Sequence, residues 1–520
     1  MTEPVFRSTL RLSSGASTDA FGLSRLGETL GFLKMLVDAQ SDRILGFAVV
    51  GAEGSETEPR WTMESILFVN ASVIFGARAQ AEREVCVLIE GDRIREVTRG
   101  HLTHCGARVI DVGGKTLMPG LIDAHAHITG LSLSPRNRAN SEAEISAAAT
   151  EYLHNSLMDG FTTLREAGGA DYAIARLLDE GKIIGPRLFY SGRALTQTGG
   201  GADFRTPGEV TDPCGSIGPY SVMSVIADGV TDVRRAAREE LRKGATQIKL
   251  FASGGVVFPS SGHSTRYEYS EAELAAIVEE AQARGTYAMA HVYSDEGVRR
   301  CLNAGVRSIE HGNFMSAETM ARLRDHGAFW DPTFISLIQR VESSQQHGLS
   351  DQIVGNLTHT ITKGQEIYAR AKELKVPICL GTDLWGPEAQ RSQIRELEVR
   401  LQLDSPDSIL ASATIVNAEL LMQKGELGVI APGAYADLLV VDGDPLSDLR
   451  VLLKPRKNLR LIMKAGKIVK KFEFAKDREV GGGAEDPFEF RQSGDFVAEQ
   501  VFAQPLRVEG DVSHNVIVPI

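Results

Sequence analysis

TQIKLFASGG (residues 246–255) is a short apolar run that follows the amphipathic helical stretch DVRRAAREELRKG (residues 232–244). The next unit along the chain repeats this order, with SEAELAAIVEEAQARG (residues 270–285) leading into TYAMAHVYS (residues 286–294). Both helical stretches begin with Asp or Ser and end in glycine, which are favoured at helix N-caps and C-termini. The pattern predicts helices that alternate with strands of a parallel sheet.

The same alternation extends outward over residues 119–425. Further apolar strands are predicted in FTTLREAG (161–168), PRLFYSGRAL (186–195), RSIEHGNF (307–314), AFWDPTF (328–334) and VPICLGTDL (376–384). No GxGxxG turn is present, since Phe204 stands where GGGADF (199–204) would need its last glycine. A closed (β/α)₈ barrel of the TIM type is therefore favoured over an open dinucleotide-binding sheet.

Two β-rich segments flank this region. Residues 62–118 and 426–471 read as short alternating strands broken by Gly, Asn and Asp, which are hairpin signals. We expect the two segments to pair into a small β-sandwich domain. Residues 1–61 form an N-terminal extension and residues 472–520 a C-terminal tail, and neither carries a strong fold signal.

Composition excludes several classes of function. The formal net charge of −12 argues against a surface for nucleic acid or for anionic membrane. The five cysteines are scattered without metal-binding spacing, which suits a reducing compartment. No signal peptide and no apolar run of membrane-spanning length is evident, so a cytoplasmic protein is expected.

The strongest chemical signal is Asp123-Ala124-His125-Ala126-His127, directly after the apolar run LMPGLI. Side chains two apart in a strand face the same side, so His125 and His127 can point at one ion. Taken alone, the pair could equally be two ordinary core or surface histidines.

Four further polar residues each end a predicted strand, where barrel active sites are assembled. They are Lys249, His291, His311 and Asp383. Imidazole and carboxylate are ligands for zinc-like ions, and a buried lysine is costly unless it is paired or its charge is removed. Each one singly could be a satisfied polar group of the core. Together, at matching strand ends, they predict a metal centre.

With these residues in view, the chain resembles the amidohydrolase superfamily with a binuclear centre. The motifs that carry the resemblance are MPGLIDAHAH (118–127), GFTTLREAGG (160–169), GVRSIEHGNF (305–314) and ADLLVVDGDPL (436–446), with the strand-end lysine and the final GTD. The resemblance covers about residues 62–471 and points to the branch that contains Xaa-Pro and Xaa-Arg dipeptidases and an ochratoxin-hydrolysing amidase.

The resemblance implies a specific site. His125, His127 and Asp383 would bind one divalent ion, His291 and His311 a second, and Lys249, carboxylated by CO₂, would bridge the two. Zn²⁺ is the expected metal. A hydroxide bridging the ions would attack the substrate carbonyl, while Asp383 carries a proton to the departing nitrogen. The implied substrates are dipeptides or N-acyl amino acids with a free carboxylate, including ochratoxin-like amides, and relatives are often homo-oligomers.

Three residues are predicted to contact substrate. Tyr293 shares a strand face with His291, and the resemblance implies that it holds the free carboxylate, although a packing role is the alternative. Arg193 and Gln197 lie in a loop that borders the pocket in relatives. That loop departs from the family, because Gly201 replaces a pocket histidine, which predicts a wider or differently charged pocket. His263 could compensate, but reads equally as a solvated loop residue.

Other functions stay open at this point. A mononuclear amidohydrolase acting on cyclic amides or deaminating, similar to imidazolonepropionase, would lack the bridging lysine. A non-catalytic barrel would have lost a ligand, and none is missing here. Residues 27–56 resemble part of the dimerisation domain of pyridine nucleotide-disulfide oxidoreductases, but no nucleotide fingerprint or redox cysteine pair accompanies them.

Overall fold

The computed structural model describes residues 65–76, 80–104, 106–131, 140–205, 223–256 and 266–472, together with the backbone of three strands in the N-terminal extension. These three are β1 (Ala16–Leu23), β2 (Gly31–Asp38) and β3 (Ile44–Val50), which pair antiparallel in that order. The oxidoreductase-like resemblance of this extension stays a prediction. The predicted C-terminal tail lies outside the described residues from position 473 onward.

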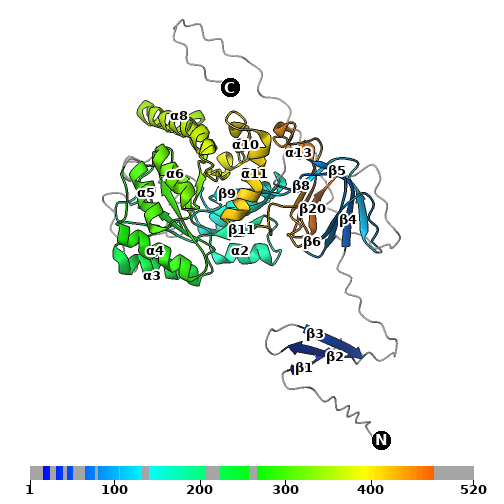
Figure 1. The fold of residues 1–520 in the computed structure, drawn as a ribbon. Helices are drawn as coiled ribbons and strands as arrows, with labels where there is room; N and C mark the ends of the chain where they lie inside the picture. The colour runs from blue at the N-terminus through cyan, green and yellow to red at the C-terminus, as the bar shows by residue number, and fades with distance from the viewer. Residues whose placement is uncertain are drawn as a thin grey trace. The chain divides into compact units, whose positions relative to one another are not determined.

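Strands from both flanking segments pair into one eight-stranded sheet, seen beside the helical part of the molecule in Figure 1. The first segment supplies β4 (Ser65–Val73), β5 (Glu82–Glu90), β6 (Arg93–Arg99), β7 (Arg108–Asp111) and β8 (Thr116–Pro119). The second supplies β18 (Leu438–Val441), β19 (Leu459–Lys464) and β20 (Lys467–Lys471). β8 and β18 run antiparallel and join the two segments. The expected pairing takes the form of a single sheet, and a two-sheet sandwich stays a prediction.

The alternation of β5 explains why this sheet is buried on two faces. Val85, Val87 and Ile89 pack into a core with residues of β4, β8 and β18. Cys86 and Leu88 point the other way and form a second, smaller cluster with residues of β4 and β7. Successive side chains of a strand face opposite sides, so apolar residues at every position bury both faces.

The middle of the chain contains parallel strands in two sheets. One sheet has the order β11 (Arg187–Tyr190), β10 (Phe161–Glu166), β9 (Leu121–Ala126). The other has the order β13 (Ser224–Ile226), β12 (Ala194–Thr196), β14 (Ile248–Phe251), β15 (Ala288–Val292), β16 (Ser308–His311), β17 (Phe329–Asp331). The parallel α/β class predicted from the alternation is therefore observed.

Residues 377–383 connect the two ends of this arrangement through the backbone. The N–H of Cys379 donates to the carbonyl of Trp330 on β17 (2.8 Å), and the N–H of Ala124 on β9 donates to the carbonyl of Leu380 (2.9 Å). Further along, the N–H of Asp383 donates to the carbonyl of His125 (2.7 Å). These bonds fix the register of residue 383 against residue 125, which matters for the site described below.

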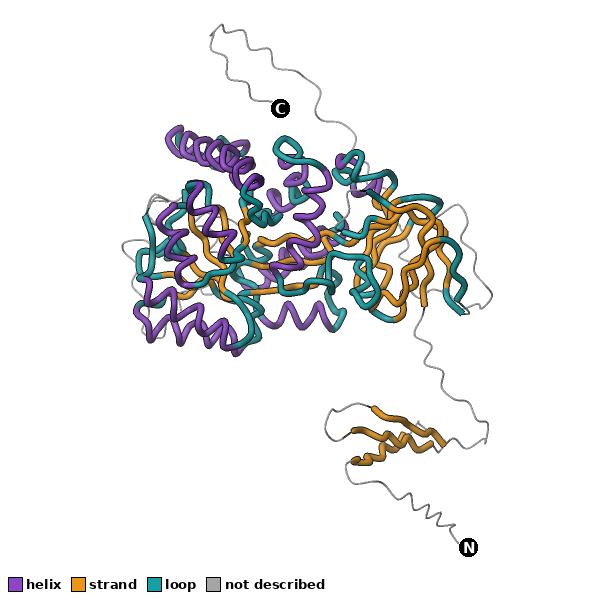
Figure 2. The backbone as a smooth tube through the Cα atoms, viewed as in Figure 1, coloured by secondary structure: helices purple, strands orange, loops and turns teal. Residues whose placement is uncertain are grey.

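Helices cover the outside of the parallel strands, purple around orange in Figure 2. The longer ones are α1 (Glu142–Met158), α2 (Tyr172–Asp179), α3 (Gly229–Arg242), α4 (Glu271–Ala283), α5 (Asp295–Ala304), α6 (Ala317–Asp325), α7 (Phe334–Glu342) and α8 (Asp351–Glu373). Short helices follow at α9 (Pro387–Gln390), α10 (Arg395–Arg400), α11 (Pro406–Ala411), α12 (Asn417–Leu420) and α13 (Pro455–Asn458). Ser141 and Ser270 form capping boxes with Glu144 and Glu273, as the sequence pattern favours.

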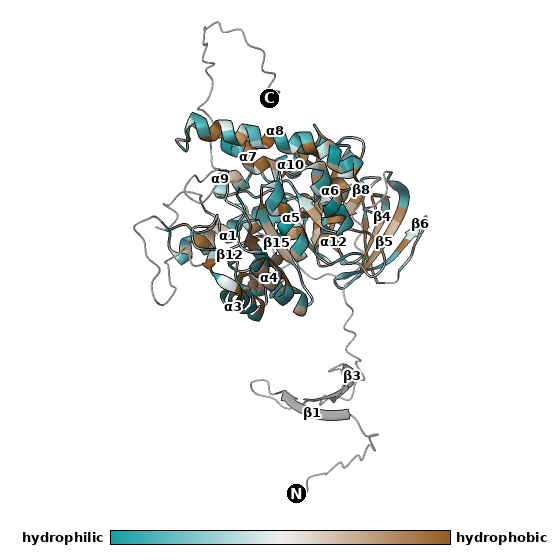
Figure 3. Cartoon of the chain, turned by 60° about the vertical axis from the view of Figure 1, so that its left-hand side comes forward, coloured by the Kyte–Doolittle hydropathy of each residue, from teal (hydrophilic) through white to brown (hydrophobic). Residues whose placement is uncertain are grey.

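Apolar side chains concentrate between helices and strands. Figure 3 shows β15 in the apolar colour and outer helices such as α5 largely in the polar colour. Trp330, Phe334 and Leu250 belong to one such core and are fully buried. Within the described part of the chain, no helix combines the length and the apolarity that are needed to span a bilayer.

Candidate metal centre

His125 and His127 lie side by side at the end of β9. Their ring centroids are 5.2 Å apart, and the two side chains are 1% and 5% exposed. The apolar run before them builds the buried strand, and the spacing of two turns both imidazoles to the same side. The first motif of the sequence thus forms one wall of a buried polar cluster.

Asp383 meets both histidines from the segment that follows β17. Its Oδ1 lies 3.1 Å from His127 Nε2 and 3.6 Å from His125 Nε2. Ligand atoms of these three residues all lie within 4.8 Å of one another. The backbone of Asp383 has φ of 52°, a left-handed conformation that costs a residue with a Cβ free energy and recurs at functional sites.

Lys249 approaches the same cluster from β14. Its side chain is buried, and its Nζ lies 3.4 Å from His125 Nε2. Burial lowers the pKa of Lys249 to about 8, because a charged ammonium loses its hydration there. A larger fraction of neutral amine is therefore present at neutral pH than for an exposed lysine.

His291 on β15 and His311 on β16 complete the cluster. His311 Nε2 lies 2.9 Å from His291 Nδ1, and the ring of His311 is 5.4 Å from that of His125. The Nε2 atom of His291 is buried and has no hydrogen-bond partner. A buried polar atom of this kind calls for a ligand, a water or an ion.

Burial sets the protonation of these groups. It lowers the pKa of His125 and of His311 to about 3, and that of His291 well below its usual value, so these imidazoles are neutral. Burial would raise the pKa of Asp383, but the hydrogen bond with His127 holds it well below its usual value. Neutral imidazoles and an ionised carboxylate are the forms that bind divalent cations.

A buried carboxylate behind His125 was not predicted from the sequence. Glu310 Oε2 lies 2.7 Å from His125 Nδ1, and both Glu310 oxygens accept from Arg165 Nη2, at 3.0 and 3.1 Å. All three side chains are at most 1% exposed. Because Glu310 accepts the Nδ1 proton, the Nε2 lone pair of His125 faces Lys249 and Asp383.

The signal that could have identified Glu310 is its place in SIEH. A charged residue inside an apolar strand must be paired to be tolerated, and Glu310 alternates with Ser308, whose hydroxyl donates to Glu310 Oε1 (2.5 Å). Asp123 plays a similar part on β9, where its carboxylate accepts from Thr382 Oγ1 (2.6 Å) and Gln393 Nε2 (2.8 Å). Glu310 thus links β16 to β9 and β10, and Asp123 links β9 to the segment after β17.

The structure brings one of the three predicted substrate contacts to this cluster. Tyr293 is buried, lines the cavity above the histidines and stacks on His311 with centroids 4.8 Å apart. Arg193 instead pairs with Glu240 (3.0 Å) and lines a different groove, beside α3. Gln197 accepts the backbone N–H of Tyr269 (2.6 Å) and does not line the cavity. His263 lies outside the described residues.

Gly201 lines the cavity but leaves no space for a side chain. A Cβ at this position would lie 2.9 Å from the carbonyl oxygen of Ser253 and 3.0 Å from the Phe251 ring. The N–H of Gly201 donates to Glu268 Oε1 (2.8 Å), which holds the loop down. This glycine lets the loop backbone approach its neighbours closely, and the expectation of a wider or differently charged pocket than in relatives stays a prediction.

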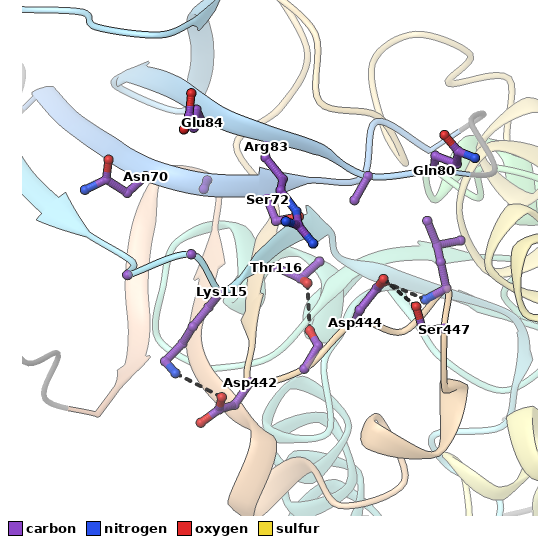
Figure 4. Close-up of a pocket in the computed structure, with 16 residues that line it drawn as sticks. Asn70, Ser72, Gln80, Arg83, Glu84, Lys115, Thr116, Asp442, Asp444 and Ser447 are labelled. Atoms are coloured by element: carbon purple, nitrogen blue, oxygen red, sulfur yellow. Dashed lines mark hydrogen bonds and ion pairs between the residues drawn. The ribbon is translucent and has the colours of Figure 1, made fainter.

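The cavity that the cluster residues other than His311 line is small, about 60 Å³. Among the described residues it is lined by His125, His127, Gly201, Phe204, Lys249, Phe251, Gly255, Val256, His291, Tyr293, Arg340, Asp383 and Trp385. A larger groove of about 830 Å³ lies on the eight-stranded sheet (Figure 4). The described residues that line it include no histidine, and Lys115 pairs there with Asp442 (2.9 Å). Chemistry, not size, identifies the smaller cavity as the candidate site.

The side chains of this cavity fit divalent metal ions. They supply neutral imidazole nitrogens, one ionised carboxylate and a lysine amine in a compact buried group. The unpartnered Nε2 of His291 is the observation that tests the fit, since a bound cation would satisfy it.

Comparison with known proteins gives a consistent result. Residues 116–469 match the model of the amidohydrolase family. The chain is 32% identical over 386 residues to the ochratoxinase of Aspergillus niger, covering 68% of this chain and 75% of that protein. A prolidase solved with N-methylphosphonate-L-proline is 37% identical with a TM-score of 0.75, covering 78% of this chain and all of the other. A Xaa-Pro dipeptidase with bound methionine is 27% identical with a TM-score of 0.69, at the same coverage.

Proposed function

The chain belongs to the amidohydrolase family, and from this premise we propose that it hydrolyses the amide bond of dipeptides or N-acyl amino acids that carry a free carboxylate. The names of its relatives support this substrate class. Prolidases and Xaa-Pro dipeptidases are named for cleaving dipeptides, and ochratoxinase for acting on ochratoxin. Ochratoxin-like amides are therefore included among the candidate substrates.

We also propose that the parallel strands form a closed barrel. The two parallel sheets and residues 377–383 would together form a (β/α)₈ barrel spanning residues 119–425, as expected for this family. The backbone bonds from residues 379 and 380 to the strands on either side support closure. Residues 62–118 and 426–471 would form the small β domain, with residues 1–61 and 472–520 as appended segments.

Two divalent ions, with Zn²⁺ as the first candidate, would be held by the residues of the cluster. His125, His127 and Asp383 would hold one ion, and His291 and His311 the other. The grouping of the first three ligand atoms within 4.8 Å and the unpartnered Nε2 of His291 support this assignment.

Lys249 would bridge the ions as a carbamate. Its neutral Nζ would add to CO₂: a C–N bond forms, one C=O π bond of CO₂ becomes the carboxylate, and the nitrogen loses one proton to water, so the buried amine becomes an anion with two oxygen ligands. The lowered pKa of Lys249, which burial causes, supports this reaction because only the neutral amine is nucleophilic.

Asp383 would act as the proton carrier. When bound, the ions polarise the scissile carbonyl and lower the pKa of a water molecule. The ionised carboxylate of Asp383 then accepts the proton of the attacking water and returns it to the amide nitrogen, which leaves poorly as an anion. Trp385 Nε1 (3.0 Å) and Ser336 Oγ (3.1 Å) donate to the two oxygens of Asp383 and fix its orientation.

The observation that carries the proposal is the convergence of six side chains from distant parts of the sequence, five of which line one cavity while the sixth, His311, contacts His291. Metal analysis and a substrate screen test it. We expect two ions per chain and release of free amino acids from N-acyl amino acids or dipeptides. One ion per chain with opening of cyclic amides or deamination would favour an imidazolonepropionase-like enzyme. Absence of both metal binding and turnover would favour a non-catalytic barrel.

A further inference from the structure

Helix α7 turns one face toward the metal centre. Thr333 at its N-cap places Oγ1 2.7 Å from His311 Nδ1, and Ser336, three residues later, donates to Asp383. Arg340 follows four residues after Ser336, on the same helical face, and lines the cavity. The helix therefore presents an arginine to the site in its last turn.

Among the described residues, the ionic partner of this arginine is Asp383. Its Nη2 lies 3.9 Å from Asp383 Oδ2, which is beyond hydrogen-bond distance, and its side chain is 16% exposed. A guanidinium carries five N–H donors in a planar fork that suits a carboxylate. Among the described residues of the cavity wall, the other cationic side chain is Lys249, which the proposed function assigns to the metal bridge.

The surroundings favour an anionic ligand at this point. Besides the polar residues of the metal centre, the cavity that Arg340 lines has an aromatic and apolar wall with Phe251, Val256 and Trp385. In such surroundings a charge is screened less than in water, so an anion gains more from the guanidinium. Tyr293 lines the same cavity and supplies a hydroxyl donor beside it.

We infer that Arg340 binds the free carboxylate of the substrate and makes the enzyme selective for amides whose leaving group is an amino acid. This inference rests on the proposed function and deepens it. Arg340 is thus a substrate-binding residue, and α7 holds it in place because its first turn is anchored at Thr333 and Ser336. The N–H of Ile335 also donates to Glu396 Oε2 (2.8 Å), which fixes the same turn from the outside.

The test compares substrates that differ only in the carboxylate. N-acetyl derivatives of L-phenylalanine, L-leucine and L-proline are each offered as the free acid and as the carboxamide, and the released amine is quantified by chromatography. We expect wild type to prefer the acids. Arg340→Gln should lower the ratio of kcat/KM for acid over carboxamide by roughly 10- to 100-fold, the value of a hydrogen bond to a charged group. Arg340→Lys, which keeps the charge without the fork, should fall between the two.

Arg395→Gln is the matched control. Arg395 is a guanidinium that also contacts α7, through Glu342 (2.9 Å), but does not line the cavity. This variant should keep the wild-type ratio. Metal content and thermal unfolding are measured for every variant, because an arginine that only positions Asp383 would change metal content and would slow both substrate types equally.

The outcomes separate the two ideas. If wild type cleaves acid and carboxamide equally well, or if Arg340→Gln leaves the ratio unchanged, the inference is wrong while the proposed function stands. If wild type cleaves no member of the panel and no dipeptide, the proposed function fails and the inference fails with it. If Arg340→Gln does not fold, Arg340→Lys is compared with the control Arg395→Gln instead. Equal ratios of kcat/KM for acid over carboxamide in these two variants overturn the inference.

Discussion

Replacing Glu310 with glutamine separates two tasks that this carboxylate performs. In the wild type it accepts the Nδ1 proton of His125 and neutralises Arg165, and all three groups are buried. Glutamine has the same shape, but its single carbonyl oxygen cannot serve both partners and its amide carries no charge. Arg165 is left as a buried cation, which costs about 3–5 kcal/mol of unfolding free energy.

The structure favours the lower end of that range. Asp331 Oδ2 lies 3.9 Å from Arg165 Nη2, and both Asp331 oxygens lack hydrogen-bond partners. Burial and the nearby charge of Glu310 raise the pKa of Asp331 well above its usual value, so this carboxyl is neutral in the wild type. Once Glu310 is uncharged, Asp331 can ionise and offset part of the loss. We therefore expect Glu310→Gln to destabilise the metal-free protein by about 3 kcal/mol.

Metal affinity should fall as well, by roughly 10- to 100-fold, because His125 loses the carboxylate that fixes its tautomer and orientation. The double variant Arg165→Met with Glu310→Gln distinguishes the two effects, since it removes the buried cation. Urea unfolding of the metal-free protein should recover part of the lost free energy, while competitive titration with a zinc chelator should show that the affinity stays low. Recovery of wild-type metal affinity in the double variant, or an unaltered affinity in Glu310→Gln, would refute the reasoning.

Three further predictions follow from the site and its surroundings. Lys249→Ala should lose most bound metal and nearly all turnover, as measured by elemental analysis and amide hydrolysis; wild-type turnover at full metal occupancy would contradict the bridging role. Asp383→Asn should keep its fold by circular dichroism and slow kcat by at least about 100-fold, because the amide cannot carry the proton, and unchanged kcat would exclude this role. Burial raises the pKa of Glu268 to about 8, so the folded protein holds a proton that the unfolded chain releases above its ordinary carboxyl pKa, and stability should fall as pH rises from about 5 to about 8. Glu268→Gln should remove this component of the pH dependence in urea unfolding, and an identical slope in both proteins would count against it.

The apolar pattern of the sequence was sufficient to predict the class of the fold. The alternation of helix and strand predicted a parallel α/β segment between β-rich flanks, because burial of strands on both faces leaves a plain apolar signature. The same logic predicted that His125, Lys249 and His311 would meet, since strand ends of a parallel sheet lie at one edge. The sequence did not predict which buried charged side chains pair with one another across the sheet.

Glu310 and Arg165 illustrate that limit. They lie 145 residues apart in sequence, and neither has a local spacing that names its partner. Arg193 and Gln197 show the same limit in a loop. The resemblance implied that this loop borders the pocket, but the direction of each side chain depends on its contact with Glu240 or Tyr269. The close packing around Gly201 could not be predicted either, because it depends on the positions of Phe251 and Ser253 in the folded chain.

The antiparallel pairing of β8 with β18 has a consequence for biosynthesis. Lys115 and its partner Asp442, which flank this pairing, are separated by 327 residues. At the usual speed of translation the ribosome needs between about 16 and 65 s to cover that distance. Throughout this interval β8 has an open edge, which is a template for pairing with another nascent chain. Completion of the eight-stranded sheet must therefore wait until β18 has been synthesised.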